Sequence, residues 1–295
     1  MDRLQHPEHY GLSIRKHHCL EGKAPCLLVE PDALAGPGKR GKILRQQLQK
    51  QHITLPAYGR VHASIVLLHG RHGRKEDLLP VAERFVAAGF RCILPDLPAH
   101  GDSPLTSMSF ASTAFEQQLP SAVLSDIQDH FGLPEEPAAL WGLSMGGSFA
   151  IRAASQQPES WQAMMVVSSF ASLETIMRKQ VPDAWQAAFP SLISLLNSLR
   201  HWQQQPSIQS IQPVQQAADI TVPALVVHGD QDNFVPMQQG IQLYQALASP
   251  NKRWLSVPNT THHNVLSSSM PLYAEMSTWL LKTLKPIHSV KASKE

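Results

Sequence analysis

Short apolar stretches alternate with amphipathic ones from about residue 61 to residue 284. Each apolar stretch is rich in β-forming residues and is bounded by turn-forming residues, which predicts a buried strand. The predicted strands are residues 64–70, 90–96, 137–142, 161–169, 221–229 and 252–258. Strands that alternate with helices are typical of βα units, so the pattern predicts an α/β fold with a mostly parallel central sheet and helices on both faces.

Helical periodicity fills the gaps between these strands. Residues 78–88 place apolar side chains on one helix face, and Gly89 is typical of the residue that ends such a helix. A second helical region covers residues 112–131, where Pro120 predicts an interruption. Further helices are predicted directly after residue 144, from residue 236 and around residues 276–284.

The segment 170–219 has no clear strand pattern. It holds a helical run over residues 184–201 and then a glutamine-rich stretch. We predict that it forms a small helical cap inserted into one α/β core, made of residues 61–169 and 220–285. Residues 286–295 are predicted to form a C-terminal tail.

The first 60 residues are predicted to add a hairpin and a basic surface insertion to this core. Residues 10–30 contain two β-forming stretches around a turn-prone Glu21-Gly22-Lys23. Residues 31–60 contain a helical run over 42–51. The basic stretch 38–50 could contact a partner, an anionic substrate or a membrane surface, but a solvated helix face is the commoner explanation.

Composition and charge narrow the function classes. A net charge of +2 gives no broad field for phosphate backbones, so no nucleic-acid partner is expected. No apolar run is long enough for a transmembrane segment and no export signal is visible, so we expect a cytoplasmic location. The three cysteines, Cys19, Cys26 and Cys92, form no CxxC pair, and we expect buried thiols rather than disulfides.

Candidate chemistry centres on Gly142-Leu143-Ser144-Met145-Gly146. This GxSxG motif follows a predicted strand directly and precedes a predicted helix. Glycines at both flanks allow a sharp turn that projects the serine from the strand end. The strand-turn-helix context makes Ser144 a candidate nucleophile.

At this point the sequence resembles the α/β-hydrolase family, from about residue 61 to residue 284. The segment 67–77, LLHGRHGRKED, is similar to the family's His-Gly oxyanion loop, and 94–104, LPDLPAHGDSP, is similar to its D-x-x-x-H-G-x-S loop. Softer similarities point to monoacylglycerol-lipase-like and feruloyl-esterase-like members. The resemblance implies an enzyme, a serine hydrolase.

The resemblance also implies two partners for the serine. In 226–236, VVHGDQDNFVP, the family pattern selects Asp232 as the carboxylate, although Asp230 lies in the same loop. In 257–266, VPNTTHHNVL, it selects His262 as the base, with His263 as the alternative. The order Ser144, Asp232, His262 is the order of this fold.

Backbone amides of Met145 and Arg71 are the implied oxyanion-hole donors. The Arg71 side chain either contacts an anionic substrate or lies in solvent or a structural salt bridge. His69, His100 and Asp96 are expected to shape loops. No metal site and no cofactor are expected, because no complete ligand set or phosphate-binding motif occurs.

We therefore expect cleavage of a carboxylic ester of a small or acyl-chain substrate through an acyl-enzyme, in the class of carboxylesterases. A thioesterase or peptidase with the same triad is the first alternative. The second is a non-catalytic member that binds a small ligand in the same pocket. The sequence leaves the oligomeric state open.

Overall fold

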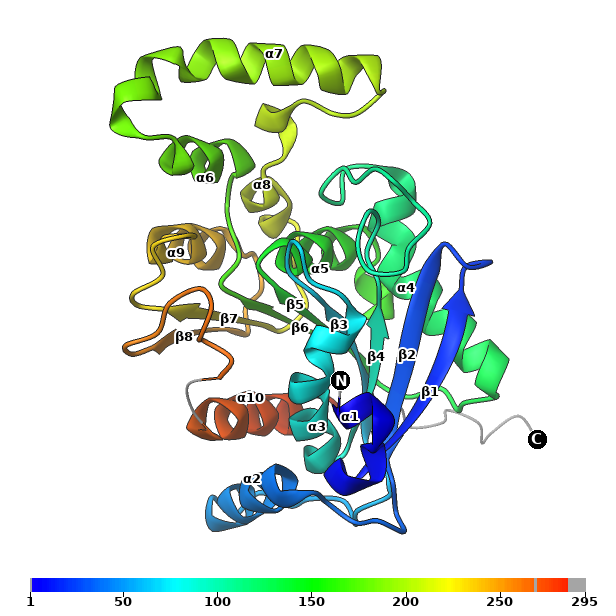
Figure 1. The fold of residues 1–295 in the computed structure, drawn as a ribbon. Helices are drawn as coiled ribbons and strands as arrows, with labels where there is room; N and C mark the ends of the chain where they lie inside the picture. The colour runs from blue at the N-terminus through cyan, green and yellow to red at the C-terminus, as the bar shows by residue number, and fades with distance from the viewer. Residues whose placement is uncertain (1, 268–269, 286–295) are drawn as a thin grey trace, which may run out of the picture.

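An eight-stranded sheet forms the centre of the computed structural model, which describes residues 2–267 and 270–285 (Figure 1). The strands are β1 (Leu12–Cys19), β2 (Ala24–Pro31), β3 (Ala63–Leu68), β4 (Phe90–Pro95), β5 (Ala138–Leu143), β6 (Ala163–Val167), β7 (Ala224–Gly229) and β8 (Lys252–Val257). Their order in the sheet is β1-β2-β4-β3-β5-β6-β7-β8. β2 is antiparallel to both β1 and β4, and all other neighbours are parallel. The predicted α/β fold with a mostly parallel sheet is confirmed.

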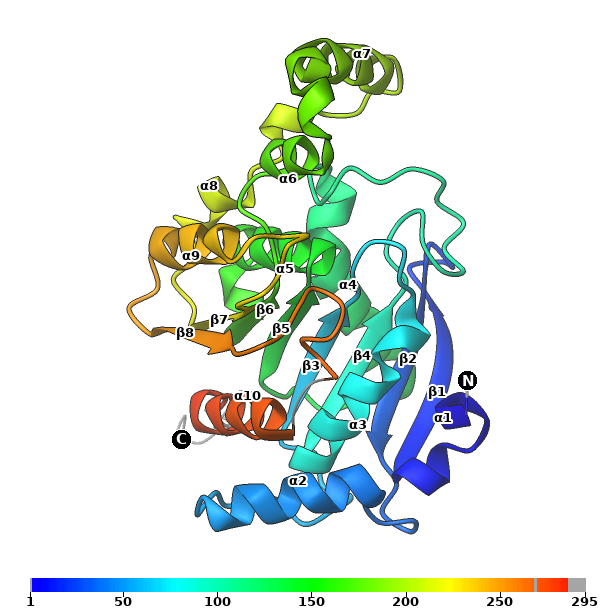
Figure 2. The ribbon, with the colours of Figure 1, turned by 60° about the vertical axis from the view of Figure 1, so that its left-hand side comes forward.

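Helices cover both faces of the sheet because its central strands are apolar on both sides. In β3, Ile65 and Leu67 belong to the core cluster under α3 and α10, whereas Val66 and Leu68 belong to the cluster under α4 and α5 (Figure 2). The helices described are α1 (Asp2–Gln5), α2 (Lys39–Lys50), α3 (Leu79–Ala88), α4 (Ala114–Phe131), α5 (Met145–Gln156), α6 (Leu173–Gln180), α7 (Phe189–Trp202), α8 (Pro213–Ala217), α9 (Met237–Ala246) and α10 (Met270–Thr283). None of the helices in the described ranges is long and apolar enough to cross a membrane.

The segment between β6 and β7 is helical and contains α6, α7 and α8. A third apolar cluster lies here and joins Leu173 and Ile176 of α6 to Phe189 and Ile193 of α7. Figures 1 and 2 both show α7 at the outer edge of the molecule, with α6 between it and the sheet. We call residues 173–202 the cap segment.

The basic helix α2 begins at Lys39, three residues before the predicted start, and it is not solvated all round. Leu44 and Leu48 are fully buried in the cluster that includes α3 and α10. Arg45 donates hydrogen bonds to the carbonyl oxygens of Pro56 and Ala87. The helix thus anchors the N-terminal segment through one apolar face, while its remaining cations face outward.

The predicted interruption at Pro120 is wrong, since α4 continues through this residue. Proline lacks the amide that would bond to the carbonyl of Glu116, one turn earlier. Burial of Leu119, Pro120 and Val123 against the sheet offsets this loss.

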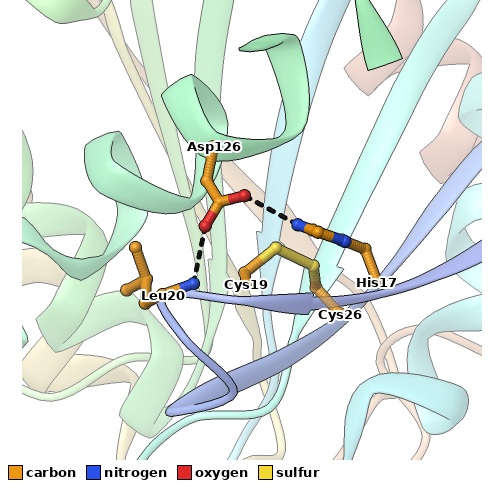
Figure 3. The surroundings of a disulfide bond; sticks show 5 residues. All are labelled: His17, Cys19, Leu20, Cys26 and Asp126. Atoms are coloured by element: carbon orange, nitrogen blue, oxygen red, sulfur yellow. Dashed lines mark hydrogen bonds and ion pairs between the residues drawn. A yellow bond between two sulfur atoms is a disulfide. The ribbon is translucent and has the colours of Figure 1, made fainter. Parts of the chain in front are cut away.

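The expectation of free thiols is also wrong for two of the three cysteines. Cys19 and Cys26 form a disulfide that joins β1 to β2 (Figure 3). Cys92 is a buried free thiol. Beside the disulfide, Asp126 of α4 accepts a hydrogen bond from the Leu20 amide at 2.6 Å and pairs with His17 at 2.7 Å. Because disulfides are rare in reducing compartments, this pair gives no support to the cytoplasmic location expected above.

Candidate active site

Ser144 lies at a sharp turn between β5 and α5, as the GxSxG motif predicts. Its φ is 51° and its ψ is −114°, a conformation that non-glycine residues rarely adopt. The flanking glycines are needed because the chain approaches itself closely: a Cβ on Gly142 would meet the backbone of Gly146, and one on Gly146 would meet that of Leu68. The tight turn holds the serine at the carboxyl edge of the sheet.

Neighbouring strands fix the backbone of this turn. The Ser144 amide donates to the Val167 carbonyl at 2.8 Å, and the Ser169 hydroxyl donates to the Ser144 carbonyl, also at 2.8 Å. Both partners belong to β6 or its end, the next strand in the sheet. The strained serine is therefore held through its main-chain amide and carbonyl, the first bonded to a carbonyl oxygen and the second to the side chain of Ser169.

Asp232 and His262 lie together, on the loops that follow β7 and β8. Nδ1 of His262 is 2.8 Å from Oδ2 of Asp232. The other carboxylate oxygen accepts hydrogen bonds from the amides of Phe234 at 3.1 Å and Val235 at 2.8 Å. Asp232 is buried and fixed by its own loop, so it can orient the imidazole.

His263, the alternative base, lies differently. Its ring meets the His262 ring edge-on, with the centroids 5.7 Å apart, and it is exposed. In the ranges 2–267 and 270–285, Asp232 pairs with His262 and not with His263. The geometry thus favours His262 of the two.

Ser144 and His262 make no direct hydrogen bond among the described residues, and Phe234 lies next to both of their surroundings. Ser144 lines a cavity of about 260 Å³, and Phe234 lines it too. The ring centroid of Phe234 is 5.0 Å from that of His262. Serine–histidine contacts are often long in ligand-free hydrolases and shorten on substrate binding, so this arrangement suits the assigned roles.

The cavity beside Ser144 is mainly apolar. It lies between the turn at Ser144, helix α6 and the loop after β7. Its apolar lining consists of Phe110, Met145, Phe170, Leu173, Ile176, Met177, Phe234 and Val235. The sequence alone did not single out these residues, because the lining comes from four separate segments that only the fold brings together.

Arg71 and Gln180 complete the lining of the cavity. Arg71 follows β3, in the loop expected to supply an oxyanion donor, and its side chain is exposed. No carboxylate pairs with it in the part of the chain that the structure describes, so of the alternatives given above the side chain lies in solvent at the rim of the cavity and the structural salt bridge is not found. Arg71 is the charged member of a lining whose other polar side chains are Ser144 and Gln180.

The loops beside the candidate nucleophile are tied together by buried polar groups. His69 accepts a hydrogen bond from the Leu97 amide at 3.0 Å, and burial holds the pKa of His69 below its usual value. Asp96 accepts from the Lys75 amide at 2.8 Å and from its ammonium at 2.6 Å. These contacts match the loop-shaping role expected of His69 and Asp96, and they add Lys75, which sequence reasoning missed.

His228 is a second missed residue. It is fully buried near the end of β7, with Nε2 2.9 Å from the Val235 carbonyl and 3.6 Å from Oδ2 of Asp232. Burial lowers its pKa, so it is neutral beside the carboxylate. No local pattern in the sequence signals this contact, because an i, i+4 spacing brings side chains together on a helix and His228 lies in a strand.

Two groups in the described ranges have ligand-type atoms close enough to hold a metal ion, and both lie away from Ser144. They are the exposed His6, Glu8 and His9, and the group His17, Cys19 and Asp126. In the second group the sulfur is committed to the disulfide and His17 to Asp126. The residues around Ser144 do not form such a group.

The site thus consists of a strained serine after β5, a carboxylate-bound histidine after β8 and an apolar cavity. A model of the prolyl oligopeptidase family matches residues 121–286, more than half of the chain. The chain belongs to the prolyl oligopeptidase family. The matched range includes Ser144, Asp232 and His262, whereas the loop with Arg71 precedes it. The sheet and the helices on its two faces have the α/β-hydrolase fold.

The individual proteins that this chain resembles have low sequence identity to it. The human acylamino-acid-releasing enzyme is 28% identical over 141 residues, which is 46% of this chain and 18% of that protein. A thermostable monoacylglycerol lipase from Bacillus sp. (strain H-257) is 22% identical over 230 residues, 72% of this chain and 88% of the lipase. The structure of the Pyrococcus furiosus esterase Pf2001 superimposes with a TM-score of 0.65 at 15% identity over 95% of both chains. The Pf2001 esterase therefore shares the fold of this chain.

Proposed function

We propose that this protein is a serine hydrolase that cleaves carboxylic esters with an apolar acyl group. The observation that carries the proposal is the pairing of His262 with Asp232 at 2.8 Å next to a cavity lined by Ser144. A serine hydroxyl needs a base to become nucleophilic, and a base needs a fixed orientation. Membership of a peptidase family and similarity to a lipase and an esterase support hydrolysis of an acyl bond.

The proposed reaction has two halves. His262 Nε2 takes the proton of Ser144 as Oγ attacks the acyl carbonyl, and the same proton then passes to the leaving alcohol. Water attacks the acyl-enzyme in the second half, with His262 as base, and the acid is released. The amides of Met145 and Arg71 stabilise the oxyanion in both halves.

The cavity sets the substrate class in this proposal. Aromatic and aliphatic side chains surround Ser144, so an apolar acyl group gains free energy by leaving water there. A volume of about 260 Å³ suits a short or medium acyl chain better than a long one. We therefore propose that the substrate is an ester with a short or medium acyl chain.

Labelling with a fluorophosphonate tests the proposal directly, because an adduct requires an activated serine and an open cavity. We expect the wild type to be labelled, Ser144→Ala to remain unlabelled, and Ser277→Ala, at a buried serine of α10 outside the cavity lining, to be labelled. Absence of an adduct on the folded wild type would favour a non-catalytic ligand-binding protein.

Peptide-bond cleavage is the second candidate, and the family match is the observation that favours it. Rates on an ester, a thioester and an anilide of the same acyl group separate the candidates. We expect the ester to be cleaved fastest. A higher kcat/KM on the anilide than on the ester would assign the protein to the peptidases instead.

A further inference from the structure

Helix α7 of the cap segment leaves a row of large apolar side chains in solvent. Trp202 is 82% exposed, Leu195 60%, Leu199 52% and Leu192 44%, and Trp185, just before the helix, is 67% exposed. Monomeric proteins rarely expose such a contiguous apolar patch without a partner. Figures 1 and 2 show that no other described helix or strand lies over the outer side of α7.

The exposed row is separate from the side of α7 that packs inward. Phe189 and Ile193 are buried in the cluster shared with α6, and they account for the attachment of α7 to the protein. Leu192, Leu195, Leu199 and Trp202 follow one another at intervals of three, four and three residues. This spacing produces the narrow seam through which one helix packs against another.

A groove lies next to the first half of this row. It has a volume of about 570 Å³, and Val181, Trp185, Phe189, Leu192 and Leu195 contribute most of its apolar wall. Trp202, the most exposed of the large apolar side chains in this row, lies at the opposite end of α7. The cap segment therefore carries a projecting indole at one end and an apolar groove at the other.

We propose that α7 packs antiparallel against α7 of a second copy of this chain. A two-fold axis at the level of residue 197 sets Leu195 against Leu199 of the second copy and Leu192 against Trp202 of the second copy. Trp202 of each copy then enters the groove beside Trp185 of the other. The same surface serves both copies, as a closed two-fold dimer requires.

The exposed area is sufficient for such a dimer. Two tryptophans and three leucines with these exposed fractions offer on the order of 600 Å² per copy, or about 1,200 Å² in all, at the lower end of specific interfaces. Tryptophan is also one of the residue types enriched among the energetic anchors of interfaces.

Charge is compatible with the pairing. α7 contains no aspartate or glutamate, and its arginine, Arg200, donates a hydrogen bond to the carbonyl of Pro206 at 2.7 Å. The antiparallel arrangement also sets opposite ends of the two helix dipoles side by side.

A lipid surface is the competing occupant, and the helix suits it less well. Interfacial helices carry a broad apolar face and lysine or arginine along the polar one. The exposed row on α7 is narrow, and its polar face holds Pro190, Ser191, Ser194, Asn197, Ser198 and His201. The polar face lacks the cations that anionic headgroups attract.

Sedimentation equilibrium of the full chain tests the proposal. We expect a dimer for the wild type and a dissociation constant at least about 30-fold higher for Leu195→Glu and for Trp202→Ala, as for loss of an interface hot spot. Leu34→Glu is the matched control, because Leu34 is fully exposed on the distant turn after β2 and should leave the dimer intact. A monomeric wild type, or a dimer that Leu195→Glu leaves unchanged, would overturn the proposal.

Cysteine cross-linking tests the orientation. Under mild oxidation, Leu195→Cys mixed with Leu199→Cys should cross-link much faster than either variant alone. Faster linking of Leu195→Cys to itself would instead indicate parallel helices and contradict the antiparallel pairing. Co-sedimentation of a monomeric wild type with phosphatidylglycerol vesicles, lost in Leu195→Glu, would assign the row to a lipid surface.

Discussion

Nδ1 of His262 lies 2.8 Å from Oδ2 of Asp232, although the two residues are 30 positions apart in the chain. β7 and β8 are parallel neighbours, so the loops at their carboxyl ends meet at one edge of the sheet. The carboxylate favours the tautomer with the proton on Nδ1, and Nε2 is then the nitrogen that can accept a proton from serine.

Replacement of Asp232 by asparagine should lower kcat about 10⁴-fold, because the amide removes the charge and favours the wrong imidazole tautomer. Ester hydrolysis at saturating substrate measures the loss. His263→Asn is the matched control and should retain most of the activity, since His263 is exposed and does not pair with Asp232. The reverse pattern would make His263 the base.

The preference of the enzyme for longer or shorter acyl groups should depend on Met177. This partly buried side chain of α6 lines the cavity, so Met177→Trp should fill part of it. We expect the ratio of kcat/KM for hexanoate over acetate esters to fall about tenfold or more, in line with the free energy of displacing one or two methylenes. Met237→Trp, at the start of α9 and outside the lining, should leave the ratio unchanged. An unchanged ratio in Met177→Trp would mean that the acyl group binds elsewhere.

Local signals explain which parts of this structure were predictable. Six predicted strands occur within a few residues of their predicted bounds, because each is a short apolar run with turn residues at its ends. The turn at Ser144 was also predictable, since its two glycines are required by close approach of backbone. The choice of Asp232 as the partner of His262 followed from the resemblance to a fold family and not from spacing, and the order of the strands in the sheet was not predicted.

Features that depend on distant segments were not predictable. Pro120 resembles a helix breaker in the sequence, and α4 continues through it because the helix buries Leu119 and Val123 against the sheet. The register of β1 with β2 brings Cys19 and Cys26 together, and composition alone gave no reason to pair them. The apolar lining of the cavity likewise unites residues from four segments, and Arg71 adds a fifth.

Loss of the Lys75 charge should destabilise the fold. The ammonium lies 2.6 Å from Oδ2 of the fully buried Asp96 and 2.5 Å from Asp102. Lys75→Met leaves the Asp96 carboxylate buried without a counter-ion, and we expect a loss of about 3 kcal/mol in the free energy of unfolding. Urea unfolding measures it.

A second substitution identifies the cause of that loss. Lys75→Met combined with Asp96→Asn removes the buried charge and should recover part of the stability. The side-chain oxygen of the asparagine can still accept the hydrogen bond from the backbone N–H of residue 75. If the double variant is less stable than Lys75→Met alone, the uncompensated charge is not the reason for the loss.

Acidification should lower stability through His69 and His228. Burial lowers the pKa of both side chains, so the folded protein keeps them neutral at a pH where the unfolded chain protonates them. The unfolded state then binds more protons, and stability falls as the pH drops below about 6.5 toward the folded-state values. Each histidine contributes at most about 1.4 kcal/mol per pH unit within that window.

His228→Gln keeps a donor for the Val235 carbonyl but does not titrate, so its unfolding free energy should fall less between pH 7.5 and pH 5.5 than that of the wild type. His18→Gln, an exposed position on β1, should show the wild-type slope. Equal slopes for the wild type and His228→Gln would show that His228 titrates alike in the folded and unfolded chains.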